Sequence, residues 1–253
     1  MITFVSNMQK MEKRAVIMGA SSGLGFEISR LLLERGYHIG IAARRNDRLQ
    51  ALKHIAPDRV ETACIDVTSP QAPAQLEELI ARLGGIDLYM HVAGIGSQNM
   101  ELQEHIELET VQTNAVGFVR MIGAAYRHMV LHGGGHIAAI SSIAGTKGLG
   151  PAPAYSATKA LQSTYIEALD QQSRLRKLNI TFTDIRPGFV HTDLLNDGRK
   201  YPMLMHCDST AQLIVKAVTA RRAVKVVDWR YRLVTCAWKL LPRWLWVRMP
   251  ISQ

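Results

Sequence analysis

Cysteine is scarce in this sequence and follows no ligand or redox pattern. Cys64, Cys207 and Cys236 are far apart in the chain and form neither a CxxC motif nor a Cys/His cluster. Small secreted proteins are often held together by paired cysteines, and structural zinc sites need closely spaced cysteines and histidines. The sequence therefore argues against a disulfide framework and a metal site, and a reducing cytoplasm fits it best.

Long apolar runs, linkers and internal repeats are absent as well. No stretch of 18 apolar residues occurs, and residues 1–14 lack the basic start and apolar centre of a secretory signal, which predicts neither export nor a membrane span. The 253 residues, 47% hydrophobic and 20% charged, are typical of one packed domain. We expect an N-terminal arm at 1–13, a main domain at 14–228 and a C-terminal tail at 229–253.

Charge of one sign is concentrated in the tail. The chain has a net charge of +9, and residues 220–253 hold eight Arg or Lys against one acid, a net +7. Because the excess is confined to the tail, it does not indicate a nucleic-acid-binding face, and we expect no nucleic-acid partner. Residues 229–250 hold all four tryptophans and no acid. This segment suits either a peripheral contact with an anionic membrane surface or a subunit contact or cover over the substrate cleft.

Apolar segments of strand length alternate with amphipathic segments of helical length along the chain. This alternation predicts an α/β fold, a doubly wound seven-stranded parallel sheet with helices on both faces. The expected strands are Ala15–Met18, Ile39–Ala43, Val60–Ile65, Leu88–Val92, His136–Ile140, Ile180–Ile185 and Val224–Val227. The expected helices are Leu24–Gly36, Asp47–Ala56, Ala72–Leu83, Glu107–His132, Tyr155–Leu175 and Ser209–Arg221.

A glycine-rich loop follows the first expected strand and runs directly into a helix. In such a loop the backbone N–H groups and the helix N-terminus can bind the pyrophosphate of a dinucleotide. The alternative is a glycine turn that joins strand and helix for structural reasons alone. The predicted cofactor contacts here are Gly19, Ser21, Ser22, Gly23, Leu24 and Gly25.

The second expected strand ends in an arginine and not in an acid. A carboxylate at this place would bind the ribose 2′-hydroxyl of NAD, whereas an arginine accepts the 2′-phosphate of NADP. Arg44 therefore favours NADP(H), with Ser21 or Ser22 assisting; the alternative is that Arg44 and Arg45 are solvated loop charges. After the third strand, Asp66 could accept a hydrogen bond from the adenine amino group, cap the following turn, or do both.

Tyr155 and Lys159 are spaced i, i+4 at the start of an expected helix, so their side chains share one face. A phenol with a pKa of about 10 is a poor base near neutrality, but an adjacent ammonium and an oxidised nicotinamide ring both favour the phenolate. We therefore expect the pKa of Tyr155 to fall toward working pH. Ser142, at the end of the fifth expected strand, could hold the substrate oxygen beside Tyr155.

Several short motifs occur together in a fixed order. With them the chain resembles the short-chain dehydrogenase/reductase family, of the NADP-preferring type, over roughly residues 13–220. The resemblance implies a Rossmann-like NADP-binding catalytic domain at 14–228. The motifs are Gly19-Ala-Ser-Ser-Gly-Leu-Gly25, Asp66-Val67, Ala93-Gly94, Asn114-Ala-Val-Gly117, Ser142, Tyr155-Ser-Ala-Thr-Lys159 and Pro187-Gly188.

The resemblance implies a role for each matching residue. Tyr155 would be the acid/base, Lys159 would contact the nicotinamide ribose, Ser142 would orient the carbonyl, and Asn114 would carry a water-linked proton relay to Lys159. A homodimer or homotetramer built on 107–132 and 155–175 is also implied. The chain departs from the family at His91-Val92, where two asparagines are usual. Further implied cofactor contacts are Val67, Ala93, Gly94, Pro187, Gly188, Val190 and Thr192.

Two weaker features remain. His128, His132 and His136 could suggest a metal set or an oxyanion loop, but we interpret them as the end of a helix and the start of a strand. Residues 193–208 form an irregular, Met- and Leu-containing stretch where the family carries a substrate lid, which favours a fairly apolar substrate. The predicted function is NADP(H)-dependent interconversion of a small-molecule carbonyl and its alcohol; the alternative is a catalytically silent NADP(H) sensor or scaffold that binds a partner through its tail.

Overall fold

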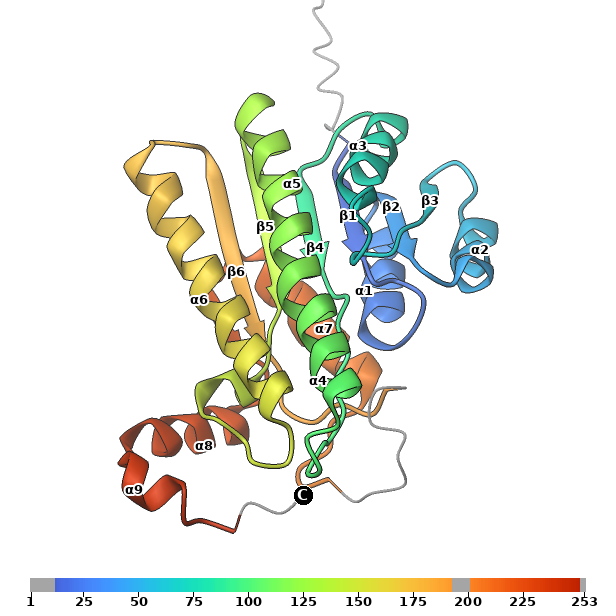
Figure 1. Ribbon diagram of the computed structural model, residues 1–253. Coiled ribbons are helices and arrows are strands. Elements are labelled where there is room, and N and C mark those ends of the chain that lie inside the picture. The colour runs from blue at the N-terminus through green and yellow to red at the C-terminus, as the bar shows by residue number, and fades with distance from the viewer. Residues whose placement is uncertain (1–11, 193–200, 251–253) are drawn as a thin grey trace, which may run out of the picture.

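A computed structural model describes residues 12–192 and 201–250 of the chain (Figure 1). Most of the expected N-terminal arm and the first half of the expected substrate lid lie outside the described residues.

One parallel sheet of seven strands forms the centre of the molecule, in the order β3-β2-β1-β4-β5-β6-β7. This order confirms the predicted doubly wound fold. The strand residues are small, β-branched or aliphatic and are mostly buried, as expected where helices cover both faces of a sheet. The strands are β1 (Arg14–Met18), β2 (His38–Ala43), β3 (Val60–Cys64), β4 (Leu88–His91), β5 (Gly135–Ile140), β6 (Ile180–Arg186) and β7 (Val224–Val226).

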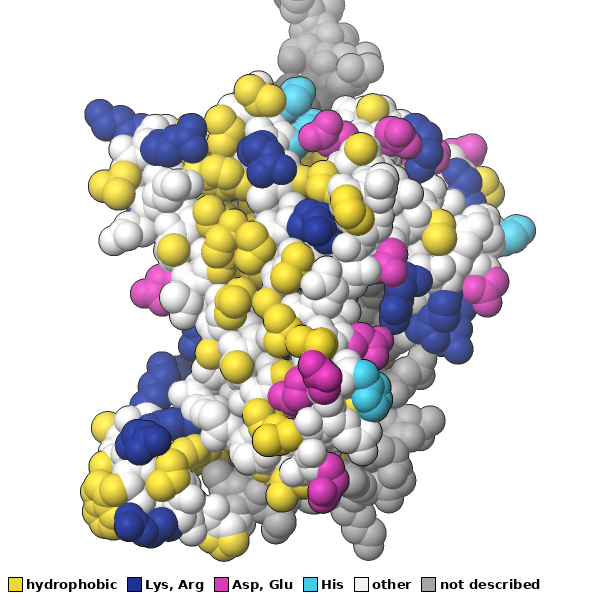
Figure 2. Space-filling view, viewed as in Figure 1, with side chains coloured by type: hydrophobic (Ala, Val, Ile, Leu, Met, Phe, Trp, Pro, Cys, Tyr) yellow, Lys and Arg dark blue, Asp and Glu magenta, His cyan; other side chains and the backbone are white. Residues whose placement is uncertain are grey.

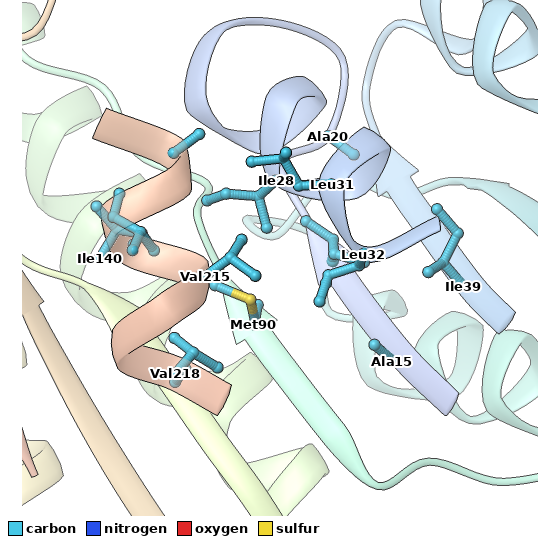
Figure 3. Close-up of a cluster of buried hydrophobic side chains, with 14 of the residues drawn as sticks. Ala15, Ala20, Ile28, Leu31, Leu32, Ile39, Met90, Ile140, Val215 and Val218 are labelled. Atoms are coloured by element: carbon cyan, nitrogen blue, oxygen red, sulfur yellow. The ribbon is translucent and has the colours of Figure 1, made fainter. Parts of the chain in front are cut away.

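Helices cover the two faces of the sheet (Figure 1). Helices α1, α2 and α7 pack into one apolar cluster with the first face, and α3, α5 and α6 pack into a second cluster with the other face. In Figure 3, Ile28 and Leu31 of α1 meet Val215 of α7 beside Met90 of β4. The helices are α1 (Gly23–Glu34), α2 (Asn46–Ile55), α3 (Ala72–Leu83), α4 (Glu104–Val111), α5 (Phe118–Leu131), α6 (Pro153–Leu175), α7 (Cys207–Thr219), α8 (Trp229–Leu240) and α9 (Arg243–Trp246).

The single helix expected over 107–132 is interrupted. Helix α4 begins at Glu104, and a π-helical segment, Gln112–Gly117, separates it from α5. One π-turn inside a helix shifts the register of the side chains that follow, and such turns are frequent at functional sites. Here the π-helical segment contains Asn114.

The tail folds into two helices that pack against the body of the protein at the lower left of Figure 1. The Asp228 carboxylate caps α8 by accepting a hydrogen bond from the Arg230 N–H at 2.8 Å. Pro242 precedes α9, where its ring cannot continue the previous helix. Tyr231 of α8 and Trp246 of α9 are buried, so each helix has one side fixed to the domain.

The described residues contain no helix that is both long and apolar enough to cross a bilayer. Within 12–192 and 201–250 no three His, Cys, Asp or Glu side chains gather in a way that could hold a metal ion. Cys64, Cys207 and Cys236 form no disulfide.

Candidate active site

The chain reverses its direction of travel across the sheet between β1 and β4, and doubly wound folds bind ligands at such a point, in the crevice at the carboxyl ends of the strands. The glycine-rich loop lies at this point. Gly19 has a φ of +98°, and a Cβ on it would lie 2.5 Å from the backbone nitrogen of Ala93, at the end of β4. A Cβ on Gly25 would collide with the carbonyl of Gly19. The loop therefore depends on glycine both for its turn and for its close approach to β4.

Arginine and serine side chains meet beside this loop, but the arginine is the neighbour of the expected one. The Arg45 guanidinium donates to the Ser22 hydroxyl at 2.9 Å and to the Ser21 hydroxyl at 3.2 Å. Arg44 instead borders a cleft of about 470 Å³ with Thr68 and the start of the π-helical segment. Both arginines flank the end of β2, and Arg45 is the one that contacts the two serines.

Asp66 caps the turn after β3. Its Oδ1 accepts hydrogen bonds from the backbone N–H of Thr68 at 2.9 Å and from the Thr68 hydroxyl at 2.8 Å. The backbone hydrogen bond is the main reason that the pKa of Asp66 lies below its usual value. The next carbonyl, of Val67, accepts from Arg120 at 3.0 Å, which ties this turn to α5.

Ser142, Tyr155 and Lys159 come together at the ends of β5 and α6. Ser142 caps a 3-10 turn, Ile143–Thr146, by accepting from the Ala144 N–H at 3.1 Å. The Lys159 ammonium lies 5.7 Å from the centre of the Tyr155 ring and donates to the Ile140 carbonyl at 2.9 Å. The i, i+4 spacing thus places both side chains on the expected common face of α6.

Burial shifts the pKa values of Tyr155 and Lys159 away from those of free side chains, upward for Tyr155 and downward for Lys159. Burial raises the pKa of the half-buried Tyr155, and a hydrogen bond with Ser142 offsets part of that rise. This differs from the expected fall, because desolvation of the phenol outweighs the neighbouring groups present in the protein itself. Burial also lowers the pKa of Lys159 to about 8, while the charge of Asp184 acts in the other direction.

Asn114 is linked to Lys159 through a side chain that sequence reasoning missed. The Asn114 carbonyl accepts from the Gln162 amide at 2.8 Å, and the Gln162 Oε1 accepts from the Lys159 ammonium at 3.0 Å. The Asn114 side chain itself pairs with the backbone N–H of Ile95 at 2.9 Å and with the Ile95 carbonyl at 2.6 Å. The Gln162 side chain therefore joins the Asn114 carbonyl to the Lys159 ammonium.

The loop after β6 closes the site from the opposite side. A Cβ on Gly23 would lie 3.1 Å from the Thr192 methyl group, so this loop contacts the glycine-rich loop, and the two border a cleft of about 430 Å³. A Cβ on Gly188 would collide with the ring of Tyr231, so α8 lies directly on the Pro187–Gly188 turn. Val190 pairs with Met205 in an isolated bridge, which holds the far end of the loop.

Comparison with known proteins identifies this arrangement. A family model described as short chain dehydrogenase matches residues 13–201. An uncharacterized oxidoreductase of Myxococcus xanthus is 34% identical over 91% of this chain and 93% of its own length. The chain belongs to the short-chain dehydrogenase family. The resemblance that its motifs suggested is therefore confirmed, and the protein is an oxidoreductase of this family.

Two other proteins that are similar to this chain have more specific descriptions. The 3-oxoacyl-[acyl-carrier-protein] reductase of Bos taurus is 28% identical over 74% of this chain and 79% of its own length. The structure of an alcohol dehydrogenase from the archaeon Thermococcus sibiricus, complexed with 5-hydroxy-NADP, superimposes with a TM-score of 0.76 at 23% identity. It covers 85% of this chain and 95% of that one.

His91 shows how this short-chain dehydrogenase accommodates its departure from the family pattern. The imidazole is buried, with Nδ1 3.1 Å from the Tyr89 hydroxyl and its ring edge-on to Phe118. Burial, and then the charge of Lys159, lower the pKa of His91 to about 3. The ring is therefore neutral near pH 7 and adds no charge near Lys159.

Two further polar networks lie next to Ser142 and Tyr155 in the chain, and each includes a contact between residues distant in sequence. The buried Asp184 accepts from the Ser141 hydroxyl and forms a 2.7 Å ion pair with Arg186, directly behind Ser142. Glu107 accepts from the backbone N–H of Ala154 at 3.1 Å, one residue before Tyr155. No local signal marks the Ser141–Asp184 and Glu107–Ala154 contacts, because each joins two separate elements.

The three clustered histidines have the structural role that we expected. His128 lies in α5, His132 follows its end and stacks on His128, and His136 lies in β5. The ring of His136 is 2.8 Å from the Thr183 hydroxyl, and burial lowers the pKa of His136 to about 4.

Proposed function

We propose that this short-chain dehydrogenase is an NADP(H)-dependent enzyme that interconverts a carbonyl and an alcohol, with Tyr155 as its acid/base. The observation that carries the proposal is the meeting of Ser142, Tyr155 and Lys159 at the crevice beside the glycine-rich loop. A silent sensor or scaffold would have no need for a buried ammonium beside a phenol, since burying a charge is unfavourable.

The residues around the crevice fit NADP(H). The glycine-rich loop has no Cβ at the two positions where one would block close approach, as a pyrophosphate-binding loop requires. Arg45 contacts the Ser21 and Ser22 hydroxyls. The guanidinium and the two hydroxyls are three donor groups with a positive charge, which suits a 2′-phosphate. The archaeal alcohol dehydrogenase with the same fold was crystallised with 5-hydroxy-NADP, which agrees with this choice.

The remaining predicted contacts complete the cofactor site in this proposal. Gly19, Gly23, Leu24 and Gly25 would hold the pyrophosphate, and Asp66 and Val67 the adenine. Arg44 borders the cleft on that side. Ala93, Gly94, Pro187, Gly188, Val190 and Thr192 would line the nicotinamide half, where a Cβ on Gly94 would lie 3.6 Å from the Lys159 ammonium.

The chain's own residues would handle the proton. NADPH, when bound, supplies the hydride. Ser142 would hold the substrate oxygen, and the Tyr155 hydroxyl would donate its proton to that oxygen as the alcohol forms. Lys159 would stabilise the resulting phenolate, and a water held by the Asn114 carbonyl would supply the proton that restores the phenol by way of Lys159. Gln162 would hold Lys159 and the Asn114 carbonyl in place for this relay.

We also propose an apolar substrate. The segments on either side of residues 193–200 are apolar, since Met205 belongs to one core cluster and Phe189 and Met203 pack against it. The similarity to a 3-oxoacyl-[acyl-carrier-protein] reductase agrees with a ketone that carries an apolar chain. We further propose that the enzyme acts in the cytoplasm as a homodimer or homotetramer, in keeping with three cysteines that form no disulfide.

Fluorescence titration with NADPH and NADH, followed by a screen of NADPH oxidation against ketones and aldehydes of increasing chain length, tests the proposal. We expect tighter binding of NADPH than of NADH and turnover of at least one apolar ketone. Tyr155→Phe should lower kcat by about 10²–10⁴-fold while leaving NADPH affinity nearly unchanged. Tight NADPH binding without turnover of any carbonyl would favour the sensor or scaffold, and absence of binding would contradict the proposal.

A further inference from the structure

Helix α8 has two apolar sides, and only one of them packs on the body of the protein. Tyr231 and Thr235 face inward and are buried. On the other side, Trp229, Leu233 and Leu240 follow one another at i, i+4 and i+11, a helical spacing that places them in one stripe. Their exposed fractions are 71%, 62% and 85%. An apolar stripe of this kind is unfavourable in water unless something covers it.

The stripe continues into α9 and the residues after it. Trp244, Val247 and Met249 are exposed, whereas the adjacent Trp246 is buried and donates its indole N–H to the Gly148 carbonyl at 2.8 Å. The exposed side chains thus belong to a segment that Trp246 anchors to the body of the protein. We call these six exposed residues the α8–α9 platform; they are Trp229, Leu233, Leu240, Trp244, Val247 and Met249.

Basic side chains surround the platform, and acids are absent from it. Residues 229–250 contain no Asp or Glu. At 100° per residue, Arg232 and Lys239 border one side of the α8 stripe and Arg230 the other. In Figure 2 this part of the molecule, at the lower left, shows hydrophobic and basic side chains with no acidic ones among them. The basic residues are Arg230, Arg232, Lys239, Arg243 and Arg248, all exposed. Arg230 forms an ion pair with Asp228 at 2.7 Å, so the positive charge of the platform comes mainly from the other four.

We propose that the α8–α9 platform docks on the surface of an anionic lipid bilayer. Exposed tryptophans and leucines bordered by Arg and Lys are the combination that places a helix flat in the interface between headgroups and acyl chains. The positive charge is complementary to anionic headgroups. A second copy of the chain is a poorer occupant, because a self-complementary contact would bring the same five cations of each copy together.

The platform also lies beside the catalytic group. Trp246 packs in a small cluster with Ala144 and Leu149, and Tyr155 lies against the same cluster. A bilayer that contacts the outer side of α8 and α9 would therefore lie on the side of the molecule where this cluster borders the crevice. Docking deepens the proposed function, since an apolar ketone could reach the site from the lipid phase.

Co-sedimentation of the full-length protein with vesicles tests the docking without any need for turnover. The vesicles are phosphatidylcholine alone, or phosphatidylcholine with about a third phosphatidylglycerol. We expect binding to the anionic vesicles only, and its loss when NaCl rises from about 0.1 M to about 0.5 M. Replacing Arg232, Lys239 and Arg243 by Gln should weaken binding about five-fold per charge, so about a hundred-fold together.

Matched variants keep the result specific to the platform. Trp229→Ser with Trp244→Ser should abolish binding, whereas Leu131→Ser with Leu175→Ser, equally exposed at the far ends of α5 and α6, should not. Gln at Arg35, Lys216 and Arg222 is the control for charge. Unchanged NADPH affinity and thermal unfolding would show that each variant is folded. The proposal is overturned if the wild-type protein ignores anionic vesicles, if platform variants bind as well as controls, or if Trp229→Ser with Trp244→Ser only dissociates an oligomer.

Discussion

Arg44 and Arg45 are adjacent residues with different surroundings, and only Arg45 contacts Ser21 and Ser22. If Arg45 binds the 2′-phosphate, Arg45→Ala removes charge-assisted hydrogen bonds that together are worth about 1.5–3 kcal/mol. We expect the Kd for NADPH to rise about 10–100-fold and the Kd for NADH to change little. Arg44→Ala is the matched control in the same fluorescence titration, and an equal loss in both variants would contradict the assignment.

Lys159 is buried, and its pKa is lowered from 10.5 to about 8 by desolvation. The unfolded chain holds this proton more tightly than the folded protein does. The free energy of unfolding therefore rises as the pH rises from about 8 to 10.5, and the destabilisation by the buried ammonium is fully present below about pH 8. The shift corresponds to about 3 kcal/mol. Lys159→Met also leaves the Ile140 carbonyl and Gln162 without their donor, so we expect a net gain of about 1–2 kcal/mol near neutrality.

Urea unfolding at about pH 7 and about pH 9 measures this effect. The gain from Lys159→Met should be about 1 kcal/mol smaller at the higher pH, because the folded wild-type protein has by then released the proton. Lys216→Met, at an exposed position of α7, should leave stability nearly unchanged at both pH values. Carbonyl reduction should be lost in Lys159→Met, and a variant less stable than wild type at both pH values would refute the argument.

The sequence identified residues whose roles depend on local spacing and could not identify those that depend on tertiary contact. Tyr155 and Lys159 share a helical face because of their i, i+4 spacing, which needs no knowledge of the fold. Gln162 and Glu107 act through partners on other helices. That Arg45 and not Arg44 contacts Ser21 and Ser22 likewise depends on how the end of β2 meets the glycine-rich loop.

At the scale of elements, hydrophobic periodicity located the strands and most helices, and their ends differ by a few residues. The π-helical segment Gln112–Gly117 was not predictable, because its residues fit a continuous helix as well and only tertiary hydrogen bonds to Asn114 favour the extra residue. Pro242 marked the break between α8 and α9. The inward side of α8 was not predictable either, since both of its sides are apolar.

Tyr231 joins α8 to the loop after β6 and to the segment before Met205. Its hydroxyl accepts from the Phe189 N–H at 3.2 Å and lies 2.8 Å from the Pro202 carbonyl. Tyr231→Phe keeps the ring against Gly188 but removes these bonds, so we expect a loss of about 1 kcal/mol in unfolding free energy. Because the loop after β6 is then less fixed, KM for the ketone should rise while NADPH affinity changes little. Tyr165→Phe, on α6, is the control, and equal kinetics in the two variants would count against this role.

At the scale of the whole molecule, the alternation of strands and helices sufficed to predict the sheet, because parallel strands need a helical crossover between them. The sheet then brings the loops after β1, β4, β5 and β6 to one edge, which is why motifs distant in sequence form one site. The fold does not determine which partner covers the exposed apolar surfaces, because proteins with the same fold bind different partners.

A second exposed apolar surface, separate from the α8–α9 platform, lies on α4, the π-helical segment, α5 and α6, on the face seen in Figure 2. Its side chains, 37–59% exposed, are Leu108, Val111, Val116, Val119 and Leu161. Because it lacks the platform's concentration of cations, it suits a two-fold contact between copies of the chain. We expect sedimentation velocity to show a dimer or tetramer.

Val119→Glu with Leu161→Glu would place charges at the centre of that contact, where they would be desolvated and would face like charges across the two-fold axis. We expect this variant to sediment as a monomer of 28.1 kDa with NADPH affinity retained. Ile55→Glu with Leu213→Glu, on α2 and α7, adds the same charges elsewhere and should keep the wild-type assembly. Since the platform is on a different part of the surface, vesicle binding should survive in the monomer, and a joint loss of both properties would show that a single surface serves both contacts.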